Sequence, residues 1–62
     1  MPWSDHYYPP AMTHLEPAVR AKAIEIANAL LAEGHDEGFC IRVAIARSKQ
    51  WAAHHGFAQS QY

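Results

Sequence analysis

The chain has 62 residues, half of them hydrophobic, and its five basic and six acidic side chains give a formal net charge of −1. One small domain is expected at this length, and it buries only about 60% of the surface that its unfolded chain exposes. The interspersed charges give no electrostatic footprint of a nucleic-acid binder, and the longest apolar run is far too short to span a bilayer. We therefore expect a single domain over residues 1–62 with no membrane segment.

The cysteine content predicts a reduced protein. Cys40 is the only cysteine, which rules out an internal disulfide. The opening residues MPWSD have neither the basic region nor the apolar region of a secretory signal. A lone cysteine in such a chain is typical of a cytoplasmic protein.

The first 16 residues predict an irregular arm that is rich in proline and aromatic residues. Residues 1–12 hold three of the four prolines and three of the seven aromatic residues, without helix or strand periodicity. Pro9 and Pro10 fix their own φ and favour extended backbone before them. The sequence T-x-x-E from Thr13 matches a capping box, so a short helical turn is expected near residues 12–15.

The large side chains of the arm are expected to fold back over a helical pair, because a lone helical hairpin cannot bury its apolar face. The alternative is a proline-rich ligand for an aromatic groove, but no PxxP pattern is present. The side chains expected to cover the hairpin are those of Trp3, Tyr7, Tyr8, Met12 and Leu15.

A first helix is predicted over residues 17–33, where Pro17 suits the first helical position. Apolar residues recur with helical spacing on one half of the cylinder. That apolar half contains Val19, Ala23, Ile24, Ile26, Ala27, Leu30 and Leu31. The opposite, polar half is expected to contain Lys22, Glu25, Asn28 and Glu33.

The segment after this helix predicts a sharp turn. Gly34 suits the left-handed conformation that ends a helix, and Asp36 suits the N-cap of the next one. Gly38 would then lie in the first turn of the second helix, where a glycine often marks the close approach of another group. Trp3 or a tyrosine of the arm is the expected neighbour.

A second helix is predicted over residues 36–55, ending at Gly56, with a frayed tail over residues 57–62. One of its faces is expected to meet the first helix, and it contains Cys40, Ile41, Ala44, Ile45, Ser48, Trp51 and Ala52. A second apolar set, Phe39, Val43 and Ala46, lies on the other side. Either the arm or another molecule is expected to cover this second set.

Together these elements predict an all-α fold, in which two helices form an antiparallel or crossed hairpin. The irregular arm, with its possible short third helical turn, is expected to pack across the pair.

Several stretches of the sequence resemble a known family. They are MPW at the start, YPPAM, the block RAKAIEIANALL, the turn EGHDEG and the segment IRVAIARSKQWA. Over Met1 to about Ala53, the chain is similar to the YdaT-like proteins, small bacterial proteins sometimes described as general-stress proteins. The resemblance implies no established activity, cofactor or catalytic residue. After the second glycine of the turn the family more usually has Arg-Ala, and Phe39-Cys40 at these positions makes this helix more apolar.

Chemistry at a metal or catalytic site has little support in the spacing. A zinc site could draw on His6, His14, His35, Cys40, His54 and His55, but the sequence has no CxxC and no HxxxH. Cys40 is expected at the core-facing edge of its helix, where burial makes a thiol inert. A single hairpin is expected to offer no concave pocket of ligand size, so we expect neither enzyme activity nor a cofactor.

Nucleic-acid binding is the main alternative, because two helices with a glycine turn resemble a helix-turn-helix. Its readers would be Arg42, Arg47, Lys49 and Gln50, which do not share one face. We instead expect a non-enzymatic module that docks on a protein partner or on itself, as a possible homodimer, through Phe39, Val43 and Ala46. Such a dimer would form a small helical bundle.

Overall fold

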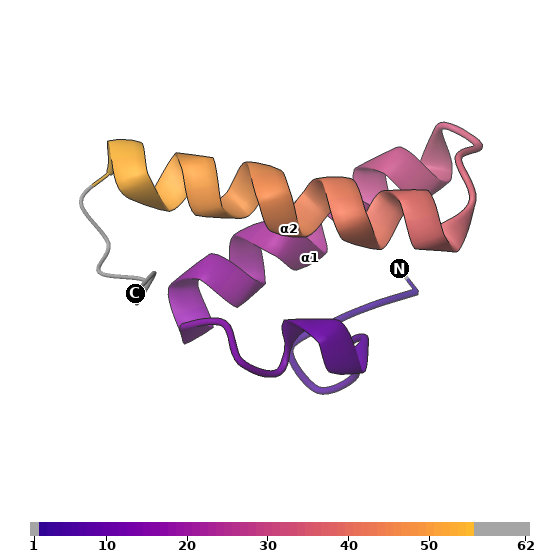
Figure 1. Ribbon diagram of the computed structural model, residues 1–62. Helices are drawn as coiled ribbons and strands as arrows, with labels where there is room; N and C mark the ends of the chain where they lie inside the picture. The colour runs from indigo at the N-terminus through magenta and orange to yellow at the C-terminus, as the bar shows by residue number, and fades with distance from the viewer. Residues whose placement is uncertain (1, 56–62) are drawn as a thin grey trace.

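The computed structural model describes residues 2–55, in which two α-helices, α1 (Pro17–Ala32) and α2 (Glu37–His54), follow a 3-10 turn, η1 (Pro10–Met12). The two helices run antiparallel and cross obliquely (Figure 1). The predicted all-α hairpin with an irregular N-terminal arm is thereby confirmed. Each helix boundary lies within one residue of its predicted position, while Gly56 and the tail over residues 57–62 lie outside the described residues.

The end of α1 is built by Gly34, which has a positive φ of 102°. Its N–H donates to the Leu31 carbonyl at 3.0 Å, and the N–H of His35 donates to the Leu30 carbonyl at 3.3 Å. These two bonds form a Schellman motif, which satisfies carbonyls that the helix itself leaves unpaired. The glycine at position 34 was therefore enough to predict where α1 ends.

The start of α2 is capped by Asp36, as its sequence position predicts. The Asp36 backbone is extended, and its Oδ2 accepts a hydrogen bond from the N–H of Phe39 at 3.1 Å. The prediction that an aromatic ring of the arm lies next to Gly38 is wrong. A Cβ added to Gly38 would lie 3.3 Å from Arg42 Nη1 and 3.4 Å from Asp36 Oδ2, and no ring of the described arm residues lies within 4 Å of it.

The short turn of the arm starts two residues earlier than expected. Pro9 is extended and Pro10 begins η1, because the fixed φ of proline suits the first helical position. The N–H of Met12 donates to the Pro9 carbonyl at 2.9 Å, and the N–H of Thr13 donates to the Pro10 carbonyl at 3.0 Å. Thr13 thus ends η1, and a further turn follows over residues 12–15, in which the N–H of Leu15 donates to the Met12 carbonyl at 3.2 Å.

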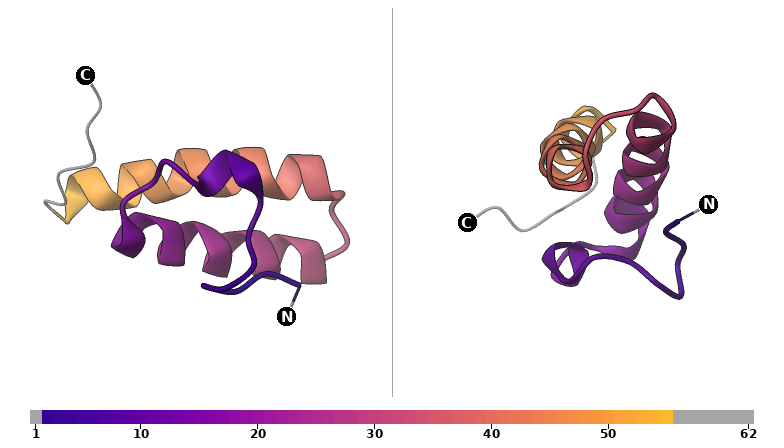
Figure 2. Two further views of the ribbon diagram at one scale, coloured as in Figure 1. Left: turned by 90° about the horizontal axis from the view of Figure 1, so that it is seen from below. Right: turned by 90° about the vertical axis from the view of Figure 1, so that its right-hand side faces the viewer.

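The arm acts as a third layer of the fold, and the view along the helices shows it closing the open side of the hairpin (Figure 2, right). Three of its large side chains are buried, with exposed fractions of 8%, 0% and 2% for Trp3, Met12 and Leu15. The rest of the buried core is apolar and comes from both helices: Val19, Ala23, Ile24, Ala27, Cys40, Ala44 and Ala52. The arm was therefore rightly expected to supply large side chains to the core.

Tyr7 is the exception, since its side chain is 70% exposed and does not cover the hairpin as expected. Ser4 and Tyr7 form a tight turn, in which the Ser4 N–H donates to the Tyr7 carbonyl at 2.8 Å and the reverse bond is 3.1 Å. Successive side chains of extended backbone point in opposite directions. Tyr8 packs inward against the core, so its neighbour Tyr7 faces outward.

None of the helices in the described part of the chain combines the length and apolar character that crossing a membrane requires.

Candidate functional site

The predicted patch of Phe39, Val43 and Ala46 lies on one side of α2. Phe39 and Val43 are half-buried and Ala46 is exposed. Neither Phe39 nor Val43 belongs to the partly buried hydrophobic side chains that pack against the core. The Phe39 ring instead lies against the exposed His35 ring, with centroids 4.8 Å apart.

The arm lies on another side of α2. It forms a groove with Glu37 and Ile41 in the first turns of the helix. Ile41 is two residues from both Phe39 and Val43, which places it roughly 160° around the helix from each of them. The arm and the patch of Phe39, Val43 and Ala46 thus occupy different faces of α2.

Asn28 is a key polar residue of the fold, and its predicted place on the solvent-facing half of α1 is wrong. Its side chain is only 5% exposed. Oδ1 accepts a hydrogen bond from the Trp3 N–H at 3.2 Å, and Nδ2 donates to the Trp3 carbonyl at 3.0 Å. Asn28 lies four residues after Ile24 and three before Leu31, and this apolar flank was the signal for its burial.

A second polar contact holds the arm through Arg20, which is partly buried on α1. Its Nη1 donates to the Tyr8 hydroxyl at 3.1 Å, and its Nη2 donates to the Leu15 carbonyl at 3.0 Å. The guanidinium carbon also lies 4.7 Å from the centre of the Tyr8 ring. Arg20 and Asn28 together tie the arm to α1 at two separated points.

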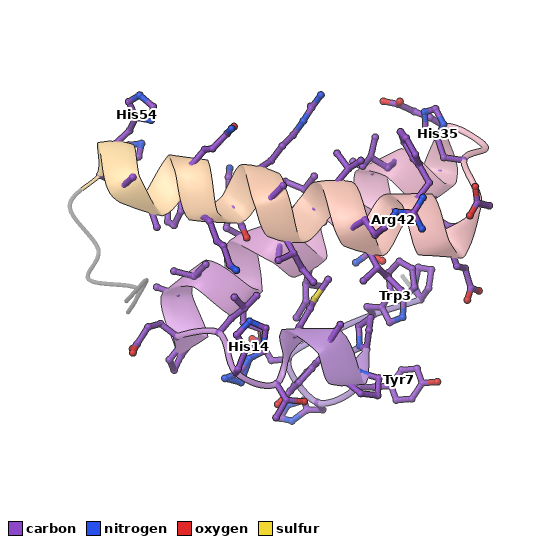
Figure 3. All side chains as sticks on the ribbon, viewed as in Figure 1. Trp3, Tyr7, His14, His35, Arg42 and His54 are labelled. Carbon is purple, nitrogen blue, oxygen red and sulfur yellow. The ribbon has the colours of Figure 1, made fainter. Side chains whose placement is uncertain are left out.

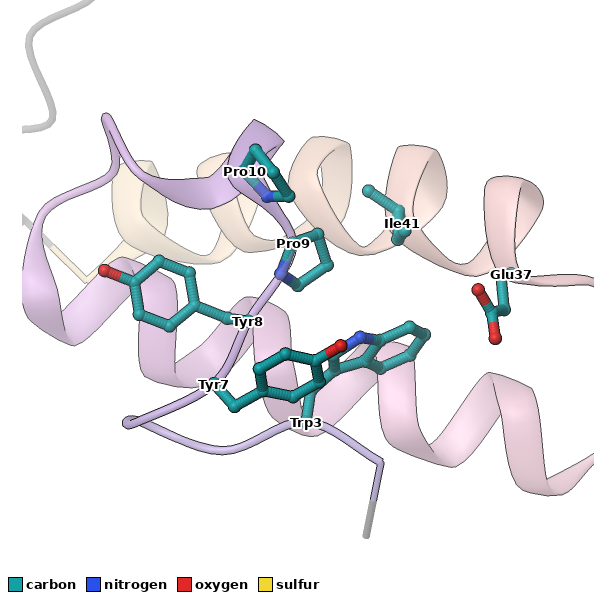
Figure 4. Close-up of a pocket in the computed structure, with 7 residues that line it drawn as sticks. All are labelled: Trp3, Tyr7, Tyr8, Pro9, Pro10, Glu37 and Ile41. Carbon is teal, nitrogen blue, oxygen red and sulfur yellow. The ribbon is translucent and has the colours of Figure 1, made fainter.

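The arm and α2 enclose an open groove of about 430 Å³. Aromatic and proline side chains of the arm form one wall and the first turns of α2 form the other (Figure 4), and the lining residues are Trp3, Tyr7, Tyr8, Pro9, Pro10, Glu37 and Ile41. Ligand pockets commonly measure about 300–1,000 Å³. The expectation that the hairpin offers no concavity of ligand size is therefore wrong, because the arm adds the second wall.

Cys40 is fully buried on the face of α2 that meets the core. Its Sγ lies 3.6 Å from the His35 carbonyl oxygen, to which it donates a weak hydrogen bond. Burial raises the pKa of the thiol, and the nearby carboxylate of Asp36 raises this pKa further. Both effects disfavour the thiolate, which is the reactive form.

We therefore expect iodoacetamide to alkylate Cys40 at pH 8 at least tenfold more slowly in the native protein than in concentrated urea. Since ionisation is easier in the unfolded chain, the free energy of unfolding should also fall as the pH rises above the ordinary pKa of a thiol. Mass spectrometry of the alkylated protein measures the rate. Equal rates in both states would contradict the protected thiol.

The histidines do not assemble into a metal site within the described residues. His14, His35 and His54 project from well-separated parts of the molecule (Figure 3). His54 Nδ1 lies 2.9 Å from the Gln50 carbonyl oxygen in the last turns of α2. Across residues 2–55, no three side chains of His, Cys, Asp or Glu are placed to hold one ion.

The four candidate nucleic-acid readers are all exposed on α2: Arg42, Arg47, Lys49 and Gln50. Arg42 and Lys49 are seven residues apart, which is about two helical turns, so they share a face. Arg47 lies well around the helix from both. The structure therefore groups two of the three basic side chains.

A search of known proteins finds a relative among curated bacterial sequences. Over 52 residues the chain is 50% identical to a protein of Bacillus subtilis (strain 168) named "Uncharacterized protein YdaT". The match covers 84% of this chain but 35% of the relative, so the chain spans about a third of the relative's length. No family model matches the chain, and no solved structure matches it significantly.

Proposed function

This chain is a YdaT-like sequence, as its resemblance predicted, and we propose that it is a non-enzymatic protein-interaction module whose α2 patch of Phe39, Val43 and Ala46 docks on a second copy. One observation carries the proposal. Two sizeable apolar side chains of the patch stay only half-buried although the arm has already closed the hairpin on another face. Water contact with these groups is unfavourable, and a partner would remove it.

The energetics favour a weak and reversible association. Burial of apolar surface contributes about 25 cal/mol per Å², from which the entropy lost on association must be subtracted. A patch centred on three residues is small beside a stable interface, which buries about 800 Å² on each partner. Two patches related by a two-fold axis would bring two α2 helices together in a small bundle.

Replacing Ala46 with glutamate should weaken self-association at least tenfold, because it places a charge within the proposed dimer contact. A tenfold change in Kd corresponds to about 1.4 kcal/mol. Sedimentation equilibrium from roughly 10 µM to 1 mM covers the range expected of a weak interface. The matched control is Ala18→Glu, an exposed alanine of α1 outside the patch, which should associate like the unchanged protein.

A mass of one chain at every concentration would contradict self-association. Equal weakening by Ala46→Glu and Ala18→Glu would instead show that net charge, and not the patch, governs the mass. Circular dichroism of both variants should retain the helical signal, since both residues are exposed on helices.

Nucleic-acid binding is the second candidate, supported by the shared exposed face of Arg42 and Lys49. It has less support than the interaction module, because the net charge of −1 gives no basic field and Arg47 points elsewhere. The cytoplasmic location and the stress association stay predictions.

A further inference from the structure

The groove between the arm and α2 is a second candidate surface, independent of the patch of Phe39, Val43 and Ala46. Its walls are aromatic rings, proline rings and the side chain of Ile41. Figure 4 shows Trp3 and Tyr7 on one side of the space and Glu37 on the other. This feature, lined by residues 3 and 7–10 of the arm and by Glu37 and Ile41 of α2, is the arm groove.

The backbone of the arm wall is fixed before any ligand arrives. Both main-chain groups of Trp3 bond to the Asn28 side chain, and reciprocal bonds of 2.8 and 3.1 Å close the turn from Ser4 to Tyr7. Pro9 and Pro10 cannot rotate about φ. A wall that is already ordered loses little conformational entropy on binding, which favours even a small ligand.

The Tyr7 ring does not contribute to the buried core. It is 70% exposed, although a tyrosine ring on a 62-residue chain could cover apolar surface. Its ring borders the arm groove, so the exposed aromatic side chain is available to a ligand there. Aromatic faces carry partial negative charge and attract cations.

Among the described residues, Glu37 is the only formally charged side chain that lines the arm groove. It is exposed, and within residues 2–55 its carboxylate has no hydrogen-bond or ion-pair partner. No basic side chain of residues 2–55 lines the same space to offset it. The groove therefore combines a carboxylate with aromatic faces, and both features favour a positive charge.

Tyr8, next to Tyr7 in the chain, already binds a cationic side chain within the fold. The Arg20 guanidinium lies 4.7 Å from the centre of the Tyr8 ring and donates to its hydroxyl. Tyr7 is the adjacent residue but faces the other way, with no cation of this chain over its ring among the described contacts.

We propose that the arm groove binds a basic side chain, arginine or lysine, of a partner polypeptide. The methylene stem of that side chain lies along the apolar surface of Pro9, Pro10 and Ile41. Its charged head lies between the Tyr7 ring and the Glu37 carboxylate. Such long side chains commonly place their stem on apolar surface and their charge in a polar site.

The test uses two matched peptides and the whole chain labelled with nitrogen-15. One peptide is acetyl-Gly-Ala-Arg-Ala-Gly-amide, and in the other citrulline replaces arginine, which keeps the shape and removes the charge. The arginine peptide should produce saturable shifts of the Trp3 indole N–H at concentrations on the order of 1–10 mM. The citrulline peptide should bind at least threefold more weakly, and the Trp51 indole N–H should not move with either.

Glu37→Gln should weaken binding of the arginine peptide at least threefold, and Tyr7→Leu should do the same while keeping an apolar side chain. Glu25→Gln is the matched control, because it removes an exposed carboxylate of α1 outside the groove and changes the net charge equally. The proposal is overturned if citrulline binds as well as arginine, if Glu37→Gln and Glu25→Gln behave alike, or if no saturable shift appears at Trp3.

Discussion

Replacing Asn28 with alanine is expected to release the N-terminal arm and to lower the free energy of unfolding by about 2–4 kcal/mol. The substitution removes two hydrogen bonds and leaves the N–H and carbonyl of Trp3 without partners at a site where this residue is only 8% exposed. Each buried polar group left unsatisfied costs about 1–3 kcal/mol. The arm can recover part of that cost only by moving into water, which exposes Trp3.

Urea unfolding followed by circular dichroism measures the change in free energy. Fluorescence in a Trp51→Phe background isolates Trp3, whose emission should shift to longer wavelength as the arm leaves the core. The control is Gln50→Ala, which removes an exposed amide of α2 and should change stability by less than about 0.5 kcal/mol. Unchanged Trp3 emission in Asn28→Ala would show that other contacts suffice to hold the arm.

Met12→Ala should lower the free energy of unfolding by about 2–5 kcal/mol, the range found when large buried side chains are cut back to alanine. Met12 is 0% exposed and is the largest fully buried side chain of the described residues. Native stability of about 0.05–0.15 kcal/mol per residue gives a 62-residue chain only about 3–9 kcal/mol in total. This one change therefore removes a large share of the stability.

Met12→Leu tests whether the volume of the buried side chain or its particular shape matters for stability. It nearly conserves volume and should cost less than about 1.5 kcal/mol. Both variants are measured by urea unfolding at one temperature. If the alanine and leucine variants were equally stable, Met12 would not fill an irreplaceable volume in the core.

Local signals in the sequence predicted the helices well. Gly34 and Asp36 each act within four residues of their own position, the first through the Schellman bonds and the second through the Phe39 N–H. The periodic apolar residues of α1 and α2 likewise identified the buried faces. Such features depend on the chain near them, so they can be predicted without knowing the tertiary structure.

Polar contacts between distant residues were not predicted, although the packing of the large arm side chains on the hairpin was. Asn28 is polar by composition, yet it is buried because it binds the backbone of Trp3, 25 residues away. Main-chain groups are the same at every residue, so no side-chain pattern marks such a partner. Tyr7 and Tyr8 point in opposite directions, and nothing in their identity indicates which one faces the core.

The arm groove has the same origin. Its two walls come from residues 3–10 and from Glu37 and Ile41, which are far apart in the sequence. A hairpin alone is too simple to form a concave surface, but the arm supplies the second wall. The patch of Phe39, Val43 and Ala46, by contrast, lies within eight residues, so its shared helix face could be predicted from helical spacing.

The buried face of α2 consists of small residues repeated every four positions: Cys40, Ala44, Ser48 and Ala52. A translation of one helix past the other by four residues, about 6 Å, would bring an almost identical row of small side chains into place. The contact between the two helices by itself therefore does not fix how far along α1 the helix α2 lies. The short connection from Glu33 to Asp36 removes this ambiguity, because the Schellman bonds at Gly34 hold the start of α2 close to the end of α1.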